Sequence, residues 1–166
     1  NTVSTQIGKL LSQAFECVED GYFDDALRLY DLVLKDDPNN IDALIDKGVT
    51  LQNMGKLNMA IKLYDEVLFL SPNNIDALVN KGASLHSDKK YSEAIACYDI
   101  VLKIDKKSLM ALAYKGLSLG ELGELEDAIK HFKKALSIDK QYDLAKISKQ
   151  VAQDLLKSIK KKPKIQ

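Results

Sequence analysis

Tryptophan is absent from the sequence, and proline, glycine and cysteine are scarce, with three, eight and two residues respectively. So few prolines and glycines argue against a fold built mainly of loops and turns. The cysteines, Cys17 and Cys97, lie far apart and form no C-x-x-C pair. This spacing favours free thiols in a reducing compartment over a disulfide framework.

Long apolar runs are also missing. No stretch approaches the ~18 residues that a membrane-spanning helix needs, although 46% of the residues are hydrophobic. The first residues show no basic segment leading into an apolar one, so we expect no signal peptide. These absences predict a cytoplasmic protein with no membrane partner and with enough apolar residues to bury a core.

Net charge is absent overall, since 24 basic residues balance 24 acidic ones. A dedicated nucleic-acid binder carries a basic excess, so nucleic acid is an unexpected partner. The balance hides a gradient, because residues 1–83 hold 13 acids and 7 bases, whereas residues 84–166 hold 11 acids and 17 bases. A chain with such poles can steer charged partners or favour head-to-tail association.

What the sequence does contain is an internal repeat with a period of 34 residues. Five columns align over four copies, which chance does not explain. They hold a leucine, a small residue, an alanine, an aromatic ring and a second leucine: Leu10, Leu44, Leu78, Leu112; Ala14, Gly48, Gly82, Gly116; Ala26, Ala60, Ala94, Ala128; Tyr30, Tyr64, Tyr98, Phe132; Leu34, Leu68, Leu102, Leu136. The repeats therefore run 7–40, 41–74, 75–108 and 109–142, after an N-terminal extension of residues 1–6.

Each repeat reads as two antiparallel helices. Apolar residues recur at steps of three and four on both sides of a short break, which contains Gly55 in the second copy, and Pro72 follows the second helix there. Helices of ~14 residues are marginal in water by themselves, so they must be stabilised by packing between neighbours. The small residues are expected to let two helix backbones approach, with the aromatic ring beside them.

These columns resemble the signature of tetratricopeptide repeats, over residues 7–142. The resemblance implies an all-α fold, a right-handed α-α superhelix. Some positions depart from the family pattern. Lys47, Lys81 and Lys115 occupy a usual leucine position, and Lys89 replaces the turn glycine of the other three repeats.

After the last repeat, residues 143–160 are predicted to form an amphipathic capping helix. Its expected apolar side, which would cover the end of the stack, consists of Leu144, Ile147, Val151, Leu155 and Ile159. Residues 161–166 are predicted to form a basic tail.

Signals of catalysis are weak. Gly116–Gly120 matches the G-x-S-x-G pattern of hydrolases, but that motif works on a strand-to-helix turn and here falls inside a predicted helix. His86 and His131 belong to no set with ligand spacing, so both read as surface residues. We therefore predict no enzyme activity, no catalytic residues, no metal and no cofactor.

The resemblance also implies a binding surface. In tetratricopeptide arrays the first helices of successive repeats line a concave groove that takes a peptide or a partner helix. Carried over position by position, the partner-binding residues are Leu11, Phe15, Asp42, Ile45, Asp46, Val49, Asp76, Val79, Asn80, Ala83, Ala113, Tyr114 and Leu117. The alternative interpretation is that the apolar members, such as Ile45 and Val49, simply pack between adjacent repeats.

The function predicted from these features is a protein–protein interaction scaffold that binds a peptide or a helix, with basic residues opposite Asp42, Asp46 and Asp76. A chaperone's C-terminal carboxylate is not expected as a ligand. Some family members bind it with a cation-rich set of groove residues, and only Asn80 of that set is present here. Two alternatives stay open: a self-associating homo-oligomer, and a weak anion or nucleic-acid contact through the lysine-rich C-terminus.

Overall fold

The computed structural model describes residues 2–161, which divide into two compact units between Ser84 and Leu85. Each unit is described by itself. Between residues 2 and 161 all nine elements are helices and none is a strand, so the predicted all-α class is confirmed. Residues 162–166, and with them most of the predicted basic tail, lie outside the described residues. None of the helices described is both long and apolar enough to cross a membrane.

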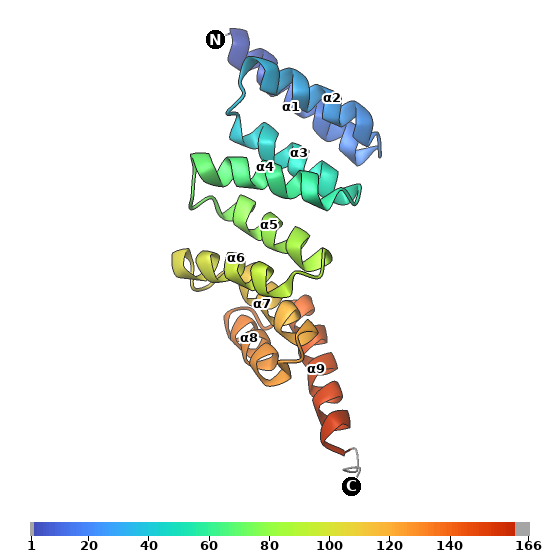
Figure 1. The fold of residues 1–166 in the computed structure, drawn as a ribbon, viewed down its shortest axis with the longest axis vertical. Coiled ribbons are helices and arrows are strands. Elements are labelled where there is room, and N and C mark those ends of the chain that lie inside the picture. Colours follow the sequence, from blue (N-terminus) through green and yellow to red (C-terminus); the bar gives the residue numbers. More distant parts are fainter. Residues whose placement is uncertain (1, 162–166) are drawn as a thin grey trace. The chain divides into compact units, whose positions relative to one another are not determined.

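The first unit contains α1 (Thr2–Glu19), α2 (Phe23–Asp36), α3 (Ile41–Asn53), α4 (Leu57–Leu70) and most of α5 (Ile75–Ser87), which runs across the boundary between the units. Helices α1 and α2 form one antiparallel pair and α3 and α4 another (Figure 1). The core around α3 and α4 is built from Leu44, Leu51, Tyr64 and Val67. Residues 2–6, expected as an extension, belong to α1.

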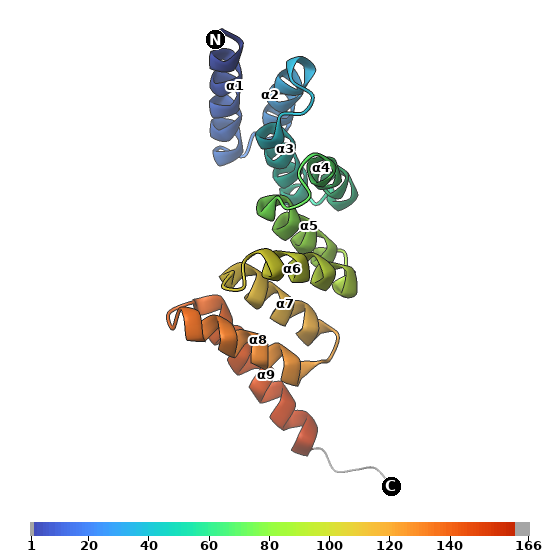
Figure 2. The ribbon, with the colours of Figure 1, turned by 90° about the vertical axis from the view of Figure 1, so that its left-hand side faces the viewer.

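The second unit contains α6 (Tyr91–Ile104), α7 (Leu109–Glu121), α8 (Leu125–Ile138) and α9 (Asp143–Lys161). Helices α7 and α8 pack as an antiparallel pair, and α9 packs against α8 and, to a lesser extent, α7 (Figure 1). Its C-terminal half extends past the ends of both (Figure 2). Leu112, Phe132 and Ala135 lie at the centre of this core. The repeat boundaries at residues 40, 74, 108 and 142 stay a prediction.

Helix ends follow from a few local residues. The side chains of Asn40 and Ser108 accept hydrogen bonds from the backbone N–H groups of Ala43 and Ala111, so they cap α3 and α7. Turns within the repeats need a left-handed residue, supplied by Gly21, Gly55 and Gly123 with φ of 81°, 79° and 84°. Lys89 adopts φ of 61° at the corresponding place.

An aromatic ring occupies the space beside the repeated glycine. A Cβ added to Gly48 would lie 2.6 Å from Cε1 of Tyr64, and one added to Gly116 would lie 2.5 Å from Cε1 of Phe132. The expected position of the ring beside the small residue is therefore confirmed at these two glycines. Each glycine leaves room for the buried ring of its own repeat.

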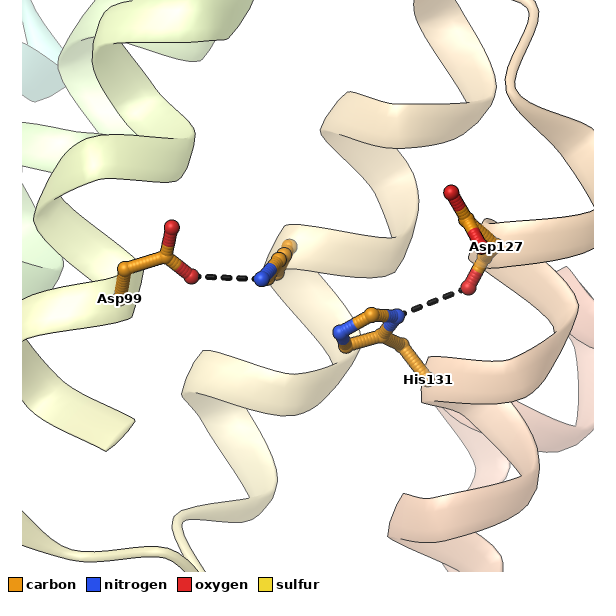
Figure 3. Close-up of polar contacts among 4 residues, drawn as sticks. Asp99, Asp127 and His131 are labelled. Atoms are coloured by element: carbon orange, nitrogen blue, oxygen red, sulfur yellow. Dashed lines mark hydrogen bonds and ion pairs between the residues drawn. The ribbon is translucent and has the colours of Figure 1, made fainter. Parts of the chain in front are cut away.

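A column of ion pairs joins successive repeats. Lys47 pairs with Asp31 at 2.7 Å, Lys81 with Asp65 at 2.6 Å, and Lys115 with Asp99 at 2.6 Å (the last in Figure 3). Each lysine stands on a first helix and each aspartate on the second helix of the preceding repeat. The lysines that depart from the family pattern therefore replace an apolar contact with an ionic one. By the same period, Lys149 of α9 corresponds to the lysines, but Lys133 of α8 stands where the aspartate is expected.

The predicted packing face of α9 is wrong. Its buried residues are Ala145 and Ala152, with Leu156 packed against the same core. Of the five residues that were expected to cover the stack, Leu144 is half-buried. The other four, which we call the α9 stripe, are exposed: Ile147 65%, Val151 61%, Leu155 48% and Ile159 53%. The physical reason is that small residues allow close packing of α9 on α8. Ala43, Ala77, Ala111 and Ala145 share one position of the period and are all 0% exposed.

The ring–glycine contact predicts opposite effects for two substitutions within α7. Gly120→Ala meets no atom within 4 Å, so it should raise the free energy of unfolding by about 0.5–1 kcal/mol through helix propensity. Gly116→Ala gains the same propensity but must displace Phe132, at a cost of about 1–3 kcal/mol. This change should therefore lower the free energy of unfolding. Denaturant unfolding measures both, and equal shifts would contradict the contact.

The interrupted ion-pair column predicts a stabilising change. Lys133→Asp places a carboxylate on α8 at the position that pairs with the first-helix lysine in the preceding repeats. It should raise the free energy of unfolding by about 0.2–1 kcal/mol at low salt, and less at high salt. Thermal or denaturant unfolding at two ionic strengths checks this. Lys134→Asp, one position along α8, is the matched control and should bring no such salt-dependent gain.

Candidate partner-binding surfaces

The predicted surface of the first unit is partly accessible. Phe15 is 62% exposed, whereas Leu11, Ile45 and Val49 are half-buried and pack at the margin of the core. Val79 is only 6% exposed. The accessible apolar part of this face is therefore Leu11, Phe15, Ile45 and Val49, which we call the unit 1 face. For Val79, the alternative interpretation of packing between helices fits its burial.

Three carboxylates accompany the unit 1 face. Asp42 and Asp46 lie on α3 and Asp76 lies at the start of α5, and all three are exposed. Partial burial, followed by the charges of Asp42 and Asp76, raises the pKa of Asp46 above its usual value. Asp46 thus lies close enough to both neighbouring carboxylates to be affected by their charge, so this part of the surface favours a cation.

The polar neighbours of these carboxylates are engaged within the helices. Asn80 donates its side-chain N–H to the carbonyl oxygen of Asp76 at 2.9 Å, and Thr50 donates its hydroxyl to that of Asp46 at 2.8 Å. Ala83 is half-buried. A bound partner would therefore contact mainly the apolar and acidic residues among those predicted in this unit.

In the second unit the predicted residues differ in accessibility. Ala113 is 0% exposed, while Tyr114 and Leu117 are partly exposed, and the Tyr114 ring lies 5.9 Å from that of Tyr98. Leu117 lines a cavity of about 220 Å³ between α7 and α9, together with Gly120, Glu121, Phe132 and three residues of the α9 stripe. This cavity was not predicted, because the residues of the stripe were expected to face the core.

A second cavity, of about 470 Å³, lies between α8 and α9 on another side of α9. Four exposed lysines line it: Lys130, Lys133, Lys157 and Lys160. Its floor includes Ile129 and Leu156, and Lys160 makes a long ion pair of 3.8 Å with Glu126. Four of the 17 basic residues of the C-terminal half therefore gather at this cavity.

The residues that look like chemistry have structural roles. Ser118 lies 2.8 Å from Nδ1 of His86, whose ring also meets Tyr91 edge-on at 5.0 Å. Ser118 is 0% exposed, so no substrate reaches its hydroxyl. His86 is not the surface residue that was expected, because it satisfies a buried serine. His131 lies 2.8 Å from the carbonyl oxygen of Asp127 (Figure 3).

Metal and thiol chemistry find little support. Among residues 2–161 no group of three or more histidine, cysteine, aspartate or glutamate side chains could hold a metal ion. Of the two cysteines, Cys97 is buried and Cys17 is partly buried. The accessible candidates for a binding site are therefore two apolar surfaces with charged neighbours, the unit 1 face and the cavity between α7 and α9.

Comparison with protein families gives two matches. A model described as anaphase-promoting complex, cyclosome, subunit 3 matches residues 19–101, half of the chain. A model described as tetratricopeptide repeat matches residues 110–142. Among curated protein sequences none matches.

Solved structures extend the likeness over most of the chain. A crystal structure of MamA is 26% identical, with a TM-score of 0.78, and the match covers 89% of this chain and 81% of that one. A tetratricopeptide repeat protein from Parabacteroides merdae is 20% identical, with a TM-score of 0.81, over 93% of this chain and 61% of that one. The first repeat domain of Spaghetti (RPAP3), bound to an HSP90 peptide, is 21% identical, with a TM-score of 0.67, over 70% and 92%.

These matches fit the helical pairs, the left-handed turn residues and the ring–glycine contacts described above. They confirm the predicted fold class, the right-handed α-α superhelix of the repeat family. The chain belongs to the tetratricopeptide repeat proteins.

Proposed function

We propose that the chain is a protein-interaction module, and not an enzyme, which holds a basic amphipathic segment of a partner protein on its first-helix surface. The fold in general suggests a scaffold for protein partners. The finer proposal rests on one observation, the unit 1 face with its acidic neighbours. The predicted cytoplasmic location stays a prediction.

The chemistry of this face selects the partner. Leu11, Phe15, Ile45 and Val49 offer apolar contact on two first helices, which suits the apolar side of a helix or an extended segment. Burial, followed by the charges of Asp42 and Asp76, raises the pKa of Asp46, so both neighbours repel the Asp46 carboxylate in the free protein. A lysine or arginine of the partner relieves this repulsion, so charge complementarity adds selectivity to the apolar contact.

The same charges disfavour an acidic ligand. The RPAP3 domain is bound to an HSP90 peptide of sequence SRMEEVD, but its 21% identity to this chain supports the shared fold alone. In this chain Ile45, Val49 and Tyr114 occupy positions where tail-binding family members carry polar or cationic groups. We therefore propose that a chaperone's C-terminal tail is not the ligand, because a carboxylate here would meet three aspartates and no cation.

Substitution of the unit 1 face tests the proposal. A synthetic amphipathic helix with leucines on one side and lysines beside them serves as the probe. The double change Ile45→Asp and Val49→Asp should weaken its binding by about tenfold or more, because two apolar contacts of ~1.5 kcal/mol each are lost. Calorimetric titration measures the affinity.

Two further variants make the result decisive. Ile45 and Val49 are half-buried, so Phe15→Asp, at a 62% exposed site, provides a change with less risk to folding and should also weaken binding. Met59→Asp, 52% exposed on α4, is the matched control and should leave the affinity unchanged. Unchanged affinity in the folded double variant and in Phe15→Asp would reject the unit 1 face as a binding surface.

The acidic neighbours predict a pH dependence of stability. Since the pKa of Asp46 is raised in the folded chain, the folded state binds more protons than the unfolded one, and stability falls as pH rises through that pKa. Asp46→Asn should therefore raise the free energy of unfolding near pH 7, with no gain below about pH 2.5, where the carboxyl is protonated in both states. Denaturant unfolding at the two pH values checks this, and a loss of stability at pH 7 would contradict it.

A further inference from the structure

The α9 stripe is the largest unexplained apolar feature of the second unit. Its four aliphatic side chains follow one another at steps of four residues and are each 48–65% exposed. Three of them, Ile147, Val151 and Leu155, line the 220 Å³ cavity shared with α7. A continuous exposed row of apolar side chains is typical of an interaction surface.

Comparison of α9 with α7 shows that the stripe does not correspond to the face by which a first helix packs on its own second helix. At the positions where α7 faces its own second helix with Leu112 and Gly116, α9 has the exposed polar residues Lys146 and Gln150. At the positions of Ala113 and Leu117, by contrast, α9 keeps Ile147 and Val151. The face that would need a following helix has thus become polar, while the face that continues the binding columns has stayed apolar.

We propose that α9 is a binding helix, and that the α9 stripe and the α7–α9 cavity together receive an amphipathic helix of a partner protein with basic residues at its border. This inference rests on the proposed function and assigns a binding surface to the second unit. Rows four residues apart on two helices interdigitate, so a helical occupant fits the stripe better than an extended one.

Charge supports a protein helix over an anionic membrane. The carboxylates of Glu121 and Asp154 border the stripe, and Glu121 lines the cavity itself. The lysines of α9 lie on other sides of the helix, as Lys157 and Lys160 show by lining the α8–α9 cavity instead. A helix that inserts into anionic lipid carries its cations beside the apolar face, and here that border is acidic.

The size of the stripe argues against a second copy of the chain. Four half-exposed aliphatic side chains offer at most a few hundred Å², whereas a stable interface buries about 800 Å² on each partner. Two α9 helices crossing at the stripe would bury little else. A partner helix that lies along α7 and α9 gains contact with Leu117 and the cavity walls as well.

The test uses the full chain with the same lysine-flanked probe helix and a counterpart in which glutamates replace the lysines. The double change Val151→Asp and Leu155→Asp, at exposed positions, should weaken binding of the lysine-flanked helix by about tenfold or more. Ile100→Asp with Ile104→Asp on α6, at positions 41% and 43% exposed, is the matched control and should leave it unchanged. The glutamate-flanked helix should bind far more weakly.

Other outcomes separate this inference from the function on which it rests. If Ile45→Asp with Val49→Asp weakens binding but the α9 variant does not, the stripe is no binding surface while the proposed function stands. If neither variant changes the affinity, or the probe does not bind, both fail. Two more results overturn the assigned occupant: vesicles rich in phosphatidylserine that bind the wild type but not the α9 variant, or a dimer, seen by sedimentation, that this variant abolishes.

Discussion

The structure depends on the burial of one face of each short helix against its neighbours. Helices α2 to α8 are 13 or 14 residues long, a length at which an isolated helix is marginal in water. Pairing is made specific by a buried ring set against a glycine, as with Tyr64 on Gly48 and Phe132 on Gly116. Ion pairs from each first helix to the preceding second helix then fix the neighbour. Binding surfaces are what these contacts leave uncovered.

Much of the fold could be predicted because the period reports directly on packing. A residue that must fill the same space in every repeat reappears every 34 positions, so Ala60, Tyr64 and their counterparts revealed the helical pairs. The turn at Lys89 was predictable for the same reason, since its φ of 61° repeats the left-handed conformation of the turn glycines. The ion pairs were visible in principle, because Asp31, Asp65 and Asp99 share the period of the three lysines.

The predictions from the sequence were wrong where a residue's role depends on a neighbour that the 34-residue period does not indicate. Among residues 2–161, α9 has no second helix of its own repeat to pack against. Hydrophobicity alone therefore suggested that its large aliphatic residues face inward, while the alanines that pack were overlooked. His86 binds a buried serine, a contact between helices of different repeats that spacing cannot indicate. Within the candidate site, Val79 and Ala113 share a column with Ile45 yet are buried, because exposure differs between copies of one position.

The charge gradient of the sequence takes a definite form in each unit. Acidic groups border the apolar faces, with Asp42, Asp46 and Asp76 in the first unit and Glu121 in the second, whereas lysines gather between α8 and α9. The central claim is that a basic amphipathic helix contacts the acid-bordered faces. Methyl NMR of the chain titrated with the lysine-flanked helix tests it most directly. The account predicts shifts at Ile45, Val49, Leu117 and Val151, and shifts confined to Ile129 and Leu156 beside the lysines would contradict it.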